Sequence, residues 1–325
     1  MLDLDADHIA ALCRGFMTSR LMLTAAELDL FTALSGRWLS AAELAAPDGW
    51  DEGALRVVLD ALVVSGLLEK RAETYSATEL CSAYLSRESP ESVLDQALEG
   101  ARLWERWSHL TERVVGHGRA PSRDPLRAAL GASDQLAPRL APGIAALVRP
   151  ETAHRFLDVG GGSGAYTIAF LARDRSLEAT LLDRPEVLAI CAEYLRAAEL
   201  EDQVVLVPGD LTCDEFPGDQ GMVLLSAVIH LLSLDQVEDL CRRAYRALLP
   251  GGRVIIRDFV MSPDRLIPRA GAIFAANLLV STEHGTTYSF PEIRRSLALA
   301  GFVDIRILQD GERMNTVIEA HRPPT

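Results

Sequence analysis

The chain lacks three features that would point to common classes of protein: a basic surplus, a long apolar run and paired cysteines. Its 325 residues include 32 Lys and Arg against 46 Asp and Glu, a formal net charge of −14. Binding to nucleic acid needs a basic face, so we expect no nucleic-acid partner. No apolar run is long enough to span a bilayer, and we expect no membrane partner. No charged-then-apolar segment opens the chain and its five cysteines form no CxxC pair, which favours a cytoplasmic location.

Length and composition allow two domains with sizeable cores, since 49% of the residues are hydrophobic. The sequence pattern changes twice along the chain. We expect a mostly helical domain over 1–100 and a catalytic α/β domain over 151–325. Between them, residues 101–150 contain five prolines, which predict a connector of short pieces: Pro121, Pro125, Pro138, Pro142 and Pro150.

The pattern of residues 1–100 is typical of a winged helix. Ser40 and Glu43 form a capping box at the start of one helix, and a second apolar-periodic helix over 51–65 ends at Gly66. Two short strands are expected at 67–70 and 74–76. The second helix carries several acids, whereas a DNA-recognition helix needs cations, so a dimerising or substrate-capping role is favoured.

From residue 155 the pattern alternates between short apolar strands and helices. Such alternation predicts a parallel sheet with helices on both faces. The segment 309–312, between the last two expected strands, contains Asp-Gly. This dipeptide predicts that the two strands form an antiparallel hairpin. The expected strands are 155–159, 178–183, 203–208, 221–227, 253–260, 303–308 and 315–320, and helices are expected at 235–249 and 268–281.

A glycine-rich turn, FLDVGGGSG (156–164), follows the first of these strands. The spacing of Gly160, Gly162 and Ala165 satisfies the dinucleotide pattern G-x-G-x-x-[G/A], so NAD is one candidate ligand. Such a turn lets a ligand touch bare backbone. Its spacing alone does not choose among nucleotides.

Acidic residues end three successive strands and favour a nucleoside that carries an amino acid. Asp158 precedes the glycines, where it would repel a pyrophosphate but receive an ammonium group. Asp183 suits both ribose hydroxyls, in NAD or in another nucleoside. Gly209, Asp210 and Leu211 follow the third strand, where an adenine edge would lie. S-adenosylmethionine fits this combination better than NAD.

Several further motifs are similar to one family: LLDRPEV (181–187), VPGD (207–210), VLLSAVIH (223–230) and LLPGGRVIIRDFV (248–260). With FLDVGGGSG they make the chain resemble the plant-type (caffeate-like) S-adenosylmethionine-dependent O-methyltransferases, which include bacterial enzymes acting on pigments and polyketides. The resemblance implies a Rossmann-like methyltransferase sheet after a winged-helix dimerisation domain, and a homodimer. It also implies S-adenosylmethionine as cofactor, S-adenosylhomocysteine as product and a small-molecule acceptor, with Ser226 at the cofactor site.

His230 aligns with the general base of that family, and Asp258 with the carboxylate beside it. An imidazole titrates near neutral pH and can take a phenolic proton as the methyl group transfers. The chain departs from the family after the base, where Leu231 and Leu232 replace the usual Asp-Trp. Thr287 stands where a second flanking glutamate is usual, and Glu283 is a candidate replacement.

The helix at 268–281 corresponds to a segment that lines the acceptor site in the family. We therefore assign Phe274, Asn277 and Leu278 to the acceptor, with Glu283 and Thr287. The expected acceptor is a hydroxyl of an aromatic or polyketide-like molecule, and no metal is assigned.

Three other functions stay open at this point. One is C-methylation, in which His230 and His284 could share a metal with other ligands. Another is an NAD-dependent oxidoreductase. The last is a non-catalytic cofactor-binding regulator that uses its winged helix.

Overall fold

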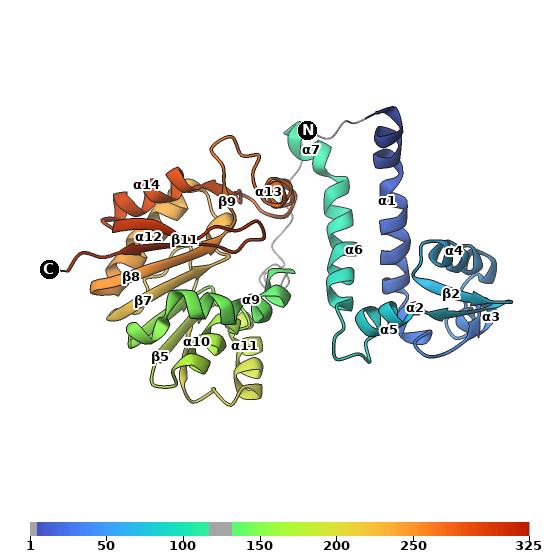
Figure 1. Cartoon of the computed structure of the whole chain (residues 1–325), viewed down its shortest axis with the longest axis horizontal. Coiled ribbons are helices and arrows are strands. Elements are labelled where there is room, and N and C mark those ends of the chain that lie inside the picture. The colour runs from blue at the N-terminus through green and yellow to red at the C-terminus, as the bar shows by residue number, and fades with distance from the viewer. Residues whose placement is uncertain (1–4, 117–131, 325) are drawn as a thin grey trace. The chain divides into compact units, whose positions relative to one another are not determined.

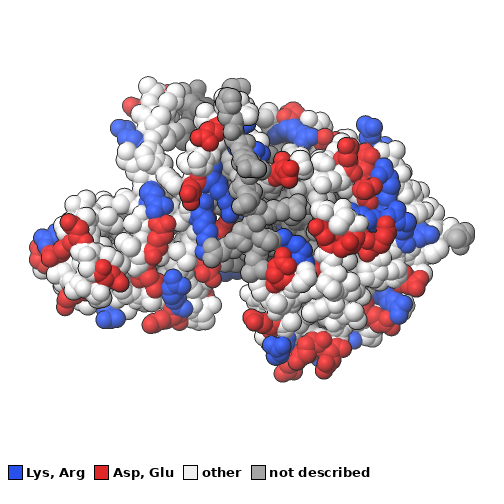
Figure 2. All heavy atoms as spheres, turned by 180° about the vertical axis from the view of Figure 1, so that it is seen from behind, with Lys and Arg blue, Asp and Glu red and all other residues white. Residues whose placement is uncertain are grey.

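The computed structural model describes residues 5–116 and 132–324, with residues 132–136 described by their backbone alone. The chain divides into two compact units, residues 1–108 and 109–325 (Figure 1). Among the described helices, none is both long enough and apolar enough to cross a membrane. On the face shown in Figure 2, acidic and basic side chains are intermingled.

The first unit has the predicted helix, turn, helix and wing. Ser40 and Glu43 form the capping box, and the two wing strands pair in antiparallel fashion, with Leu68 opposite Ala77. A third short strand completes a sheet in the order β1-β3-β2. The elements are α1 (Ala6–Glu27), α2 (Leu30–Ala33), β1 (Leu39–Ser40), α3 (Ala41–Ala45), α4 (Glu52–Val64), β2 (Leu68–Arg71), β3 (Thr74–Ala77), α5 (Glu79–Leu85) and α6 (Leu94–Ser108).

The second unit is an α/β domain. Its elements are α7 (Leu110–Val114), α9 (Ala132–Val148), η1 (Pro150–Thr152), β4 (Arg155–Val159), α10 (Ala165–Arg173), β5 (Glu178–Asp183), α11 (Pro185–Ala197), β6 (Val204–Pro208), β7 (Gln220–Ser226), η2 (Ile229–Leu231), α12 (Leu234–Ala247), β8 (Leu248–Asp258), β9 (Val260–Met261), α13 (Arg269–Ser281), β10 (Tyr288–Ser289), α14 (Phe290–Ala300), β11 (Val303–Gln309) and β12 (Thr316–His321).

The large sheet of this unit has the strand order β11-β12-β8-β7-β4-β5-β6. Strands β4 to β8 pair in parallel, whereas β12 is antiparallel to both β8 and β11. The predicted parallel sheet with an antiparallel terminal hairpin is therefore confirmed. Because β4, β5, β6, β7 and β8 run in the same direction, their carboxyl ends meet at one edge of the sheet.

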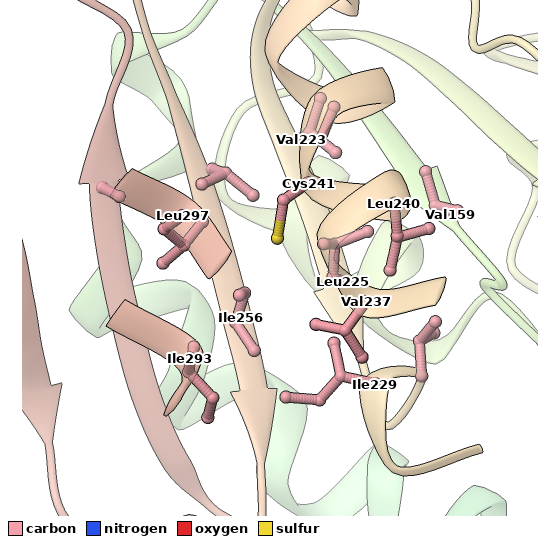
Figure 3. Packing of buried hydrophobic residues seen from close by; sticks show 14 of the residues in the cluster. Val159, Val223, Leu225, Ile229, Val237, Leu240, Cys241, Ile256, Ile293 and Leu297 are labelled. Atoms are coloured by element: carbon pink, nitrogen blue, oxygen red, sulfur yellow. The ribbon is translucent and has the colours of Figure 1, made fainter. Parts of the chain in front are cut away.

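Two apolar clusters cover the two faces of this sheet. On one face, α12 and α14 pack against the strands through residues such as Leu240, Leu297 and Ile256 (Figure 3). On the other face, α9, α10 and α11 bury Ala141, Phe170 and related side chains. Helices on both faces explain why the strands are apolar throughout rather than alternating.

Two details of the sequence prediction are wrong. Pro138 and Pro142 lie inside α9 instead of breaking the segment, while Pro121 and Pro125 lie outside the described residues. Pro138 and Pro142 are four residues apart on the exposed face of the helix, so water can satisfy the carbonyls that lose a partner. The hairpin loop comprises residues 310–315 rather than the predicted 309–312, and in it the Asp310 carboxylate accepts bonds from the Gly311 amide and the Thr316 hydroxyl.

Candidate active site

The glycine loop joins β4 to α10 at the carboxyl edge of the sheet. Gly160, Gly162 and Gly164 adopt φ angles of 69°, 57° and 78°, in the left-handed region that favours glycine. A Cβ atom on Gly161 would stand 2.6 Å from the buried Leu181 side chain. The loop therefore has to be bare backbone, and it leaves main-chain groups facing the space above the strands.

A pocket opens beside this loop. Four of the residues assigned to the cofactor from the sequence line it: Asp158, Gly160, Gly162 and Ser226. Sequence reasoning missed two polar lining residues, Tyr166 and Arg257. An arginine inside the otherwise apolar run VIIRDF was the signal that could have identified Arg257. The remaining lining residues are Ala137, Gly161, Ala165 and Ala227.

Asp158 is a buried acid at the base of the pocket, with an exposed fraction of 1%. Its Oδ2 accepts a 2.8 Å hydrogen bond from Thr167 Oγ1. Burial raises the pKa of Asp158 to about 7, and the charge of Asp183 adds to the rise. A cationic group entering the pocket would favour the ionised form.

Asp183 lies at the end of β5 and supports the glycine loop. Its Oδ2 accepts a 3.0 Å bond from the Gly162 amide, and its Oδ1 accepts a 2.8 Å bond from the Arg184 amide. Burial raises its pKa, while these two amide bonds oppose the rise. The structure thus brings together the first two acids predicted from the sequence.

The third strand end lies next to the same loop. The Gly209 amide donates to the Asp183 carbonyl at 3.0 Å, and a Cβ atom on Gly160 would meet Leu211 at 3.2 Å. Asp210 is half-buried, and its Oδ1 accepts bonds from the amide and the hydroxyl of Thr212. Residues 209–211 therefore border the side of the loop that faces β5.

His230 and Asp258 form a buried pair at the ends of neighbouring segments. The short helix η2 presents His230, whose Nδ1 lies 2.9 Å and 3.0 Å from the two oxygens of Asp258 at the end of β8. The exposed fractions of the two residues are 6% and 0%. Asp258 Oδ1 also accepts a 2.8 Å bond from the Phe259 amide, which fixes the carboxylate. With the Nδ1 proton donated to Asp258, Nε2 has a lone pair available to accept a proton.

An aromatic side chain lies against this imidazole. The Phe274 ring stands edge-on to the His230 ring, with centroids 5.0 Å apart, and lies 5.2 Å from the Phe259 ring. Phe274 belongs to α13, which also carries the half-buried Asn277 and the buried Leu278. Of the residues assigned to the acceptor, Phe274 is thus in direct contact with His230.

The segment that follows α13 packs against the backbone of His230. The Thr286 amide donates to the His230 carbonyl at 3.0 Å, and Thr287 is buried one residue further on. Glu283 and His284 are exposed, and their side chains approach one another to 3.6 Å. No hydrogen bond or ion pair joins either of them to His230 within the described part of the chain. There, no group of three His, Cys, Asp or Glu side chains is placed to hold a metal ion.

Comparison with known proteins identifies the family of this chain. Residues 145–303 match the O-methyltransferase domain, and residues 10–87 match the O-methyltransferase dimerisation domain. The tetracenomycin polyketide synthesis 8-O-methyl transferase of Streptomyces glaucescens is 32% identical over 311 residues, covering 92% of this chain and 91% of that protein. The chain belongs to the O-methyltransferase family.

Other relatives agree with this assignment. The 3-hydroxy-5-methyl-1-naphthoate 3-O-methyltransferase of Streptomyces sahachiroi is 27% identical, covering 92% of this chain and 90% of that protein. The solved structure of a mitomycin 7-O-methyltransferase is 25% identical, with a TM-score of 0.84 and coverage of 97% of each chain. The predicted resemblance is therefore confirmed, and these comparisons favour O-methylation over C-methylation or NAD chemistry.

The enzyme uses S-adenosylmethionine, as its family does. Two solved structures of the same fold are complexes: PigF with S-adenosylhomocysteine, at a TM-score of 0.87, and human N-acetylserotonin methyltransferase with S-adenosylmethionine, at 0.78. The bare glycine loop and the pocket beside it fit such a cofactor, since backbone amides, Asp158 and Arg257 all border one space.

Proposed function

We propose that this O-methyltransferase acts on a hydroxyl of an aromatic or polyketide-like small molecule, with His230 as the general base. The observation that carries the proposal is the buried His230–Asp258 contact in the same domain as the cofactor pocket, with Phe274 edge-on to the imidazole. The names of the Streptomyces relatives, which act in tetracenomycin synthesis and on a naphthoate, support the substrate class.

The cofactor side of the site is assigned residue by residue. Asp158 and the backbone of Gly160 and Gly162 receive the methionine half of S-adenosylmethionine, next to Ser226. Asp183 binds the ribose hydroxyls. Residues 209–211, which comprise Gly209, Asp210 and Leu211, border the adenine. Their adjacency around one loop supports this order.

The bound cofactor supplies an activated methyl group on a sulfonium, and the protein supplies position and a proton acceptor. His230 Nε2 takes the proton of the acceptor hydroxyl. Asp258 holds the Nδ1 proton, fixes the ring orientation and stabilises the imidazolium that results. Such a base contributes about 10²–10⁴-fold to the rate.

The acceptor side is apolar and aromatic. Phe274 supplies a ring against which a flat acceptor can pack. Asn277 and Leu278 lie on the same helix, α13. Thr287 lies on the segment that supports His230, and we keep it with the acceptor site. The exposed Glu283 makes no contact with the base, so its assignment rests on the sequence alone.

The domain assignment is part of the same proposal. Residues 1–100 form the dimerisation domain, 101–150 a connector and 151–325 the catalytic domain. Helix α1 exposes a set of apolar side chains, and burying such a face in a homodimer would remove it from water. These side chains are Ile9, Leu12, Phe16 and Met17.

The proposal is tested with a panel of phenolic polyketides and naphthoates. Purified protein is incubated with S-adenosylmethionine carrying an isotopically labelled methyl group, and the products are examined by mass spectrometry and NMR. We expect a labelled methoxy group and an equal amount of S-adenosylhomocysteine. A label on carbon would replace O-methylation by C-methylation, and a failure to bind S-adenosylhomocysteine at all would contradict the cofactor assignment.

A further inference from the structure

Arg257 is a buried cation, and none of the described carboxylates pairs with it. Its exposed fraction is 2%, and it forms no ion pair within the described residues. Among the described residues, its side chain makes one hydrogen bond, a long one of 3.4 Å from Nη1 to Ser226 Oγ, and its buried Nε has no partner there. Burying a charge without an opposite charge is unfavourable, because the ion loses its hydration and gains no partner in return. A partner that is not part of the described chain would remove this cost.

The position of Arg257 indicates where such a partner would sit. The residue lines the pocket beside the glycine loop, at the penultimate position of β8. Its guanidinium lies 5.4 Å from the centre of the Tyr166 ring, in the first turn of α10. The Tyr166 hydroxyl is also buried without a hydrogen-bond partner in the part of the chain that the structure describes. Two unsatisfied donors and the Ser226 hydroxyl therefore border one small space.

Asp158 lines the same pocket, so the lining contains one acidic side chain, Asp158, and one cationic side chain, Arg257. Asp158 and Arg257 do not pair with each other. Two separated opposite charges suit a zwitterion, because each end of the ligand meets the charge it requires. A pyrophosphate would meet Arg257 favourably but would be repelled by Asp158.

We propose that Arg257, with the hydroxyls of Tyr166 and Ser226, binds the α-carboxylate of the cofactor's methionine half, opposite Asp158 at the ammonium. This assignment rests on the proposed function, which places the methionine half beside the glycine loop. The guanidinium offers parallel N–H groups to both carboxylate oxygens, as arginine does in bidentate pairs. The carboxylate supplies the counter-ion that Arg257 lacks.

Calorimetry with two product analogues tests the proposal. S-adenosylhomocysteine carries the carboxylate, whereas its decarboxylated analogue keeps the ammonium, ribose and adenine. We expect the wild-type protein to bind S-adenosylhomocysteine about tenfold to hundredfold more tightly than the analogue. In Arg257→Met this preference should vanish through weaker binding of S-adenosylhomocysteine, with analogue affinity retained.

Three further variants separate binding from folding. Arg257→Lys keeps the charge and should recover part of the preference, and Tyr166→Phe, which removes one hydroxyl, should reduce it less than Arg257→Met does. Arg253→Met is the matched control, because Arg253 lies on the same strand but pairs with Glu319 at 2.8 Å. Its preference for the carboxylate should stay at the wild-type value.

The outcomes are distinct. If Arg257→Met loses affinity for both ligands equally, Arg257 has a structural role and the proposal is overturned. The same holds if the variant keeps the full preference. If the wild-type protein binds neither ligand, the proposed function itself fails. Thermal unfolding shows which variants are folded. If Arg257→Met does not fold, the carboxylate preferences of Tyr166→Phe and Arg257→Lys test the proposal instead.

Discussion

On the donor side of the site, the glycine loop and the buried Asp158 line the pocket, whereas on the acceptor side a histidine lies against the ring of Phe274. The part of the donor side made by the glycine loop, Asp158 and Asp183 lies within the span from β4 to β5. The acceptor side comprises His230, Asp258 and Phe274, which come from η2, β8 and α13. The glycine loop, Asp158 and Asp183 are thus close in sequence, whereas the acceptor side is assembled from distant segments. We infer that binding of the cofactor and removal of the acceptor proton can be altered separately.

The largest expected effect comes from His230→Ala on the acceptor side. Loss of the proton acceptor should lower kcat by about 10²–10⁴-fold. Affinity for S-adenosylhomocysteine should stay within about twofold, because His230 is absent from the residues that line the cofactor pocket. Steady-state kinetics and calorimetry measure the two quantities.

His284→Ala is the matched control, since His284 is exposed and makes no bond to His230. Wild-type turnover is expected for this variant. Unchanged turnover in His230→Ala would remove the base hypothesis, and an equally large loss in both variants would point to a role shared by the two histidines.

A smaller loss is expected from Asp258→Asn. The amide keeps an oxygen for the Phe259 N–H group but loses the charge that stabilises the imidazolium. A hydrogen bond to a charged group is worth roughly 1.5–3 kcal/mol, so kcat should fall about tenfold to hundredfold. Single-turnover measurements with saturating cofactor test this, and full activity would show that the pair has no catalytic role.

On the donor side, Asp183→Ala should weaken binding of S-adenosylhomocysteine by roughly tenfold to hundredfold. The variant loses the predicted ribose contact and the 3.0 Å bond that holds the Gly162 amide. Turnover at saturating cofactor should change much less. Asp174→Ala, at an exposed carboxylate that bonds to Ser176, is the control. Calorimetry that finds equal affinity in Asp183→Ala and wild type would refute the ribose assignment.

The smallest expected effect is a proton released from Asp158. Its pKa of about 7 means that the carboxyl is largely protonated at pH 6, and a bound ammonium favours the carboxylate. Binding of S-adenosylhomocysteine should therefore release a proton near pH 6, and affinity should rise as the pH increases through 7. Calorimetry in two buffers of different ionisation enthalpy measures the release, which should be absent from Asp158→Asn.

The same pKa governs the stability of the protein without ligand. The folded state keeps the Asp158 proton up to about pH 7, whereas the unfolded state releases it near the ordinary aspartate pKa of 3.8. The folded state thus binds the extra proton between these values, so its stability should decrease as the pH rises through this window. Identical heats in both buffers together with a flat unfolding profile would contradict the assignment of Asp158.

Much of the donor side could be predicted from the sequence because its determinants are local. A short apolar strand, an acid and a run of glycines lie within a few residues, and strand ends of a parallel sheet meet at one edge. The longer-range features could not be predicted this way. Arg257 and Tyr166 lie about 90 residues apart, and only the folded chain brings the Arg257 guanidinium over the Tyr166 ring, where each side chain has a buried polar atom with no partner among the described residues.

The acceptor side was predicted less completely, for a related reason. The His230–Asp258 pair followed from the family resemblance, and its two residues meet because β7 and β8 are neighbours. Glu283 is a candidate second acid only because it is close in sequence to Thr287. The direction of its side chain depends on how the segment after α13 folds back. That segment presents its backbone to His230 and leaves the Glu283 side chain exposed.

A crystal structure of the enzyme with S-adenosylhomocysteine tests the separation of the two sides most directly. We expect the methionine carboxylate on Arg257, the ammonium beside Asp158, the ribose on Asp183, and the sulfur facing a space bordered by His230 and Phe274. A methionine half directed away from Arg257 and Asp158, or a sulfur out of reach of an acceptor held at His230, would contradict this expectation.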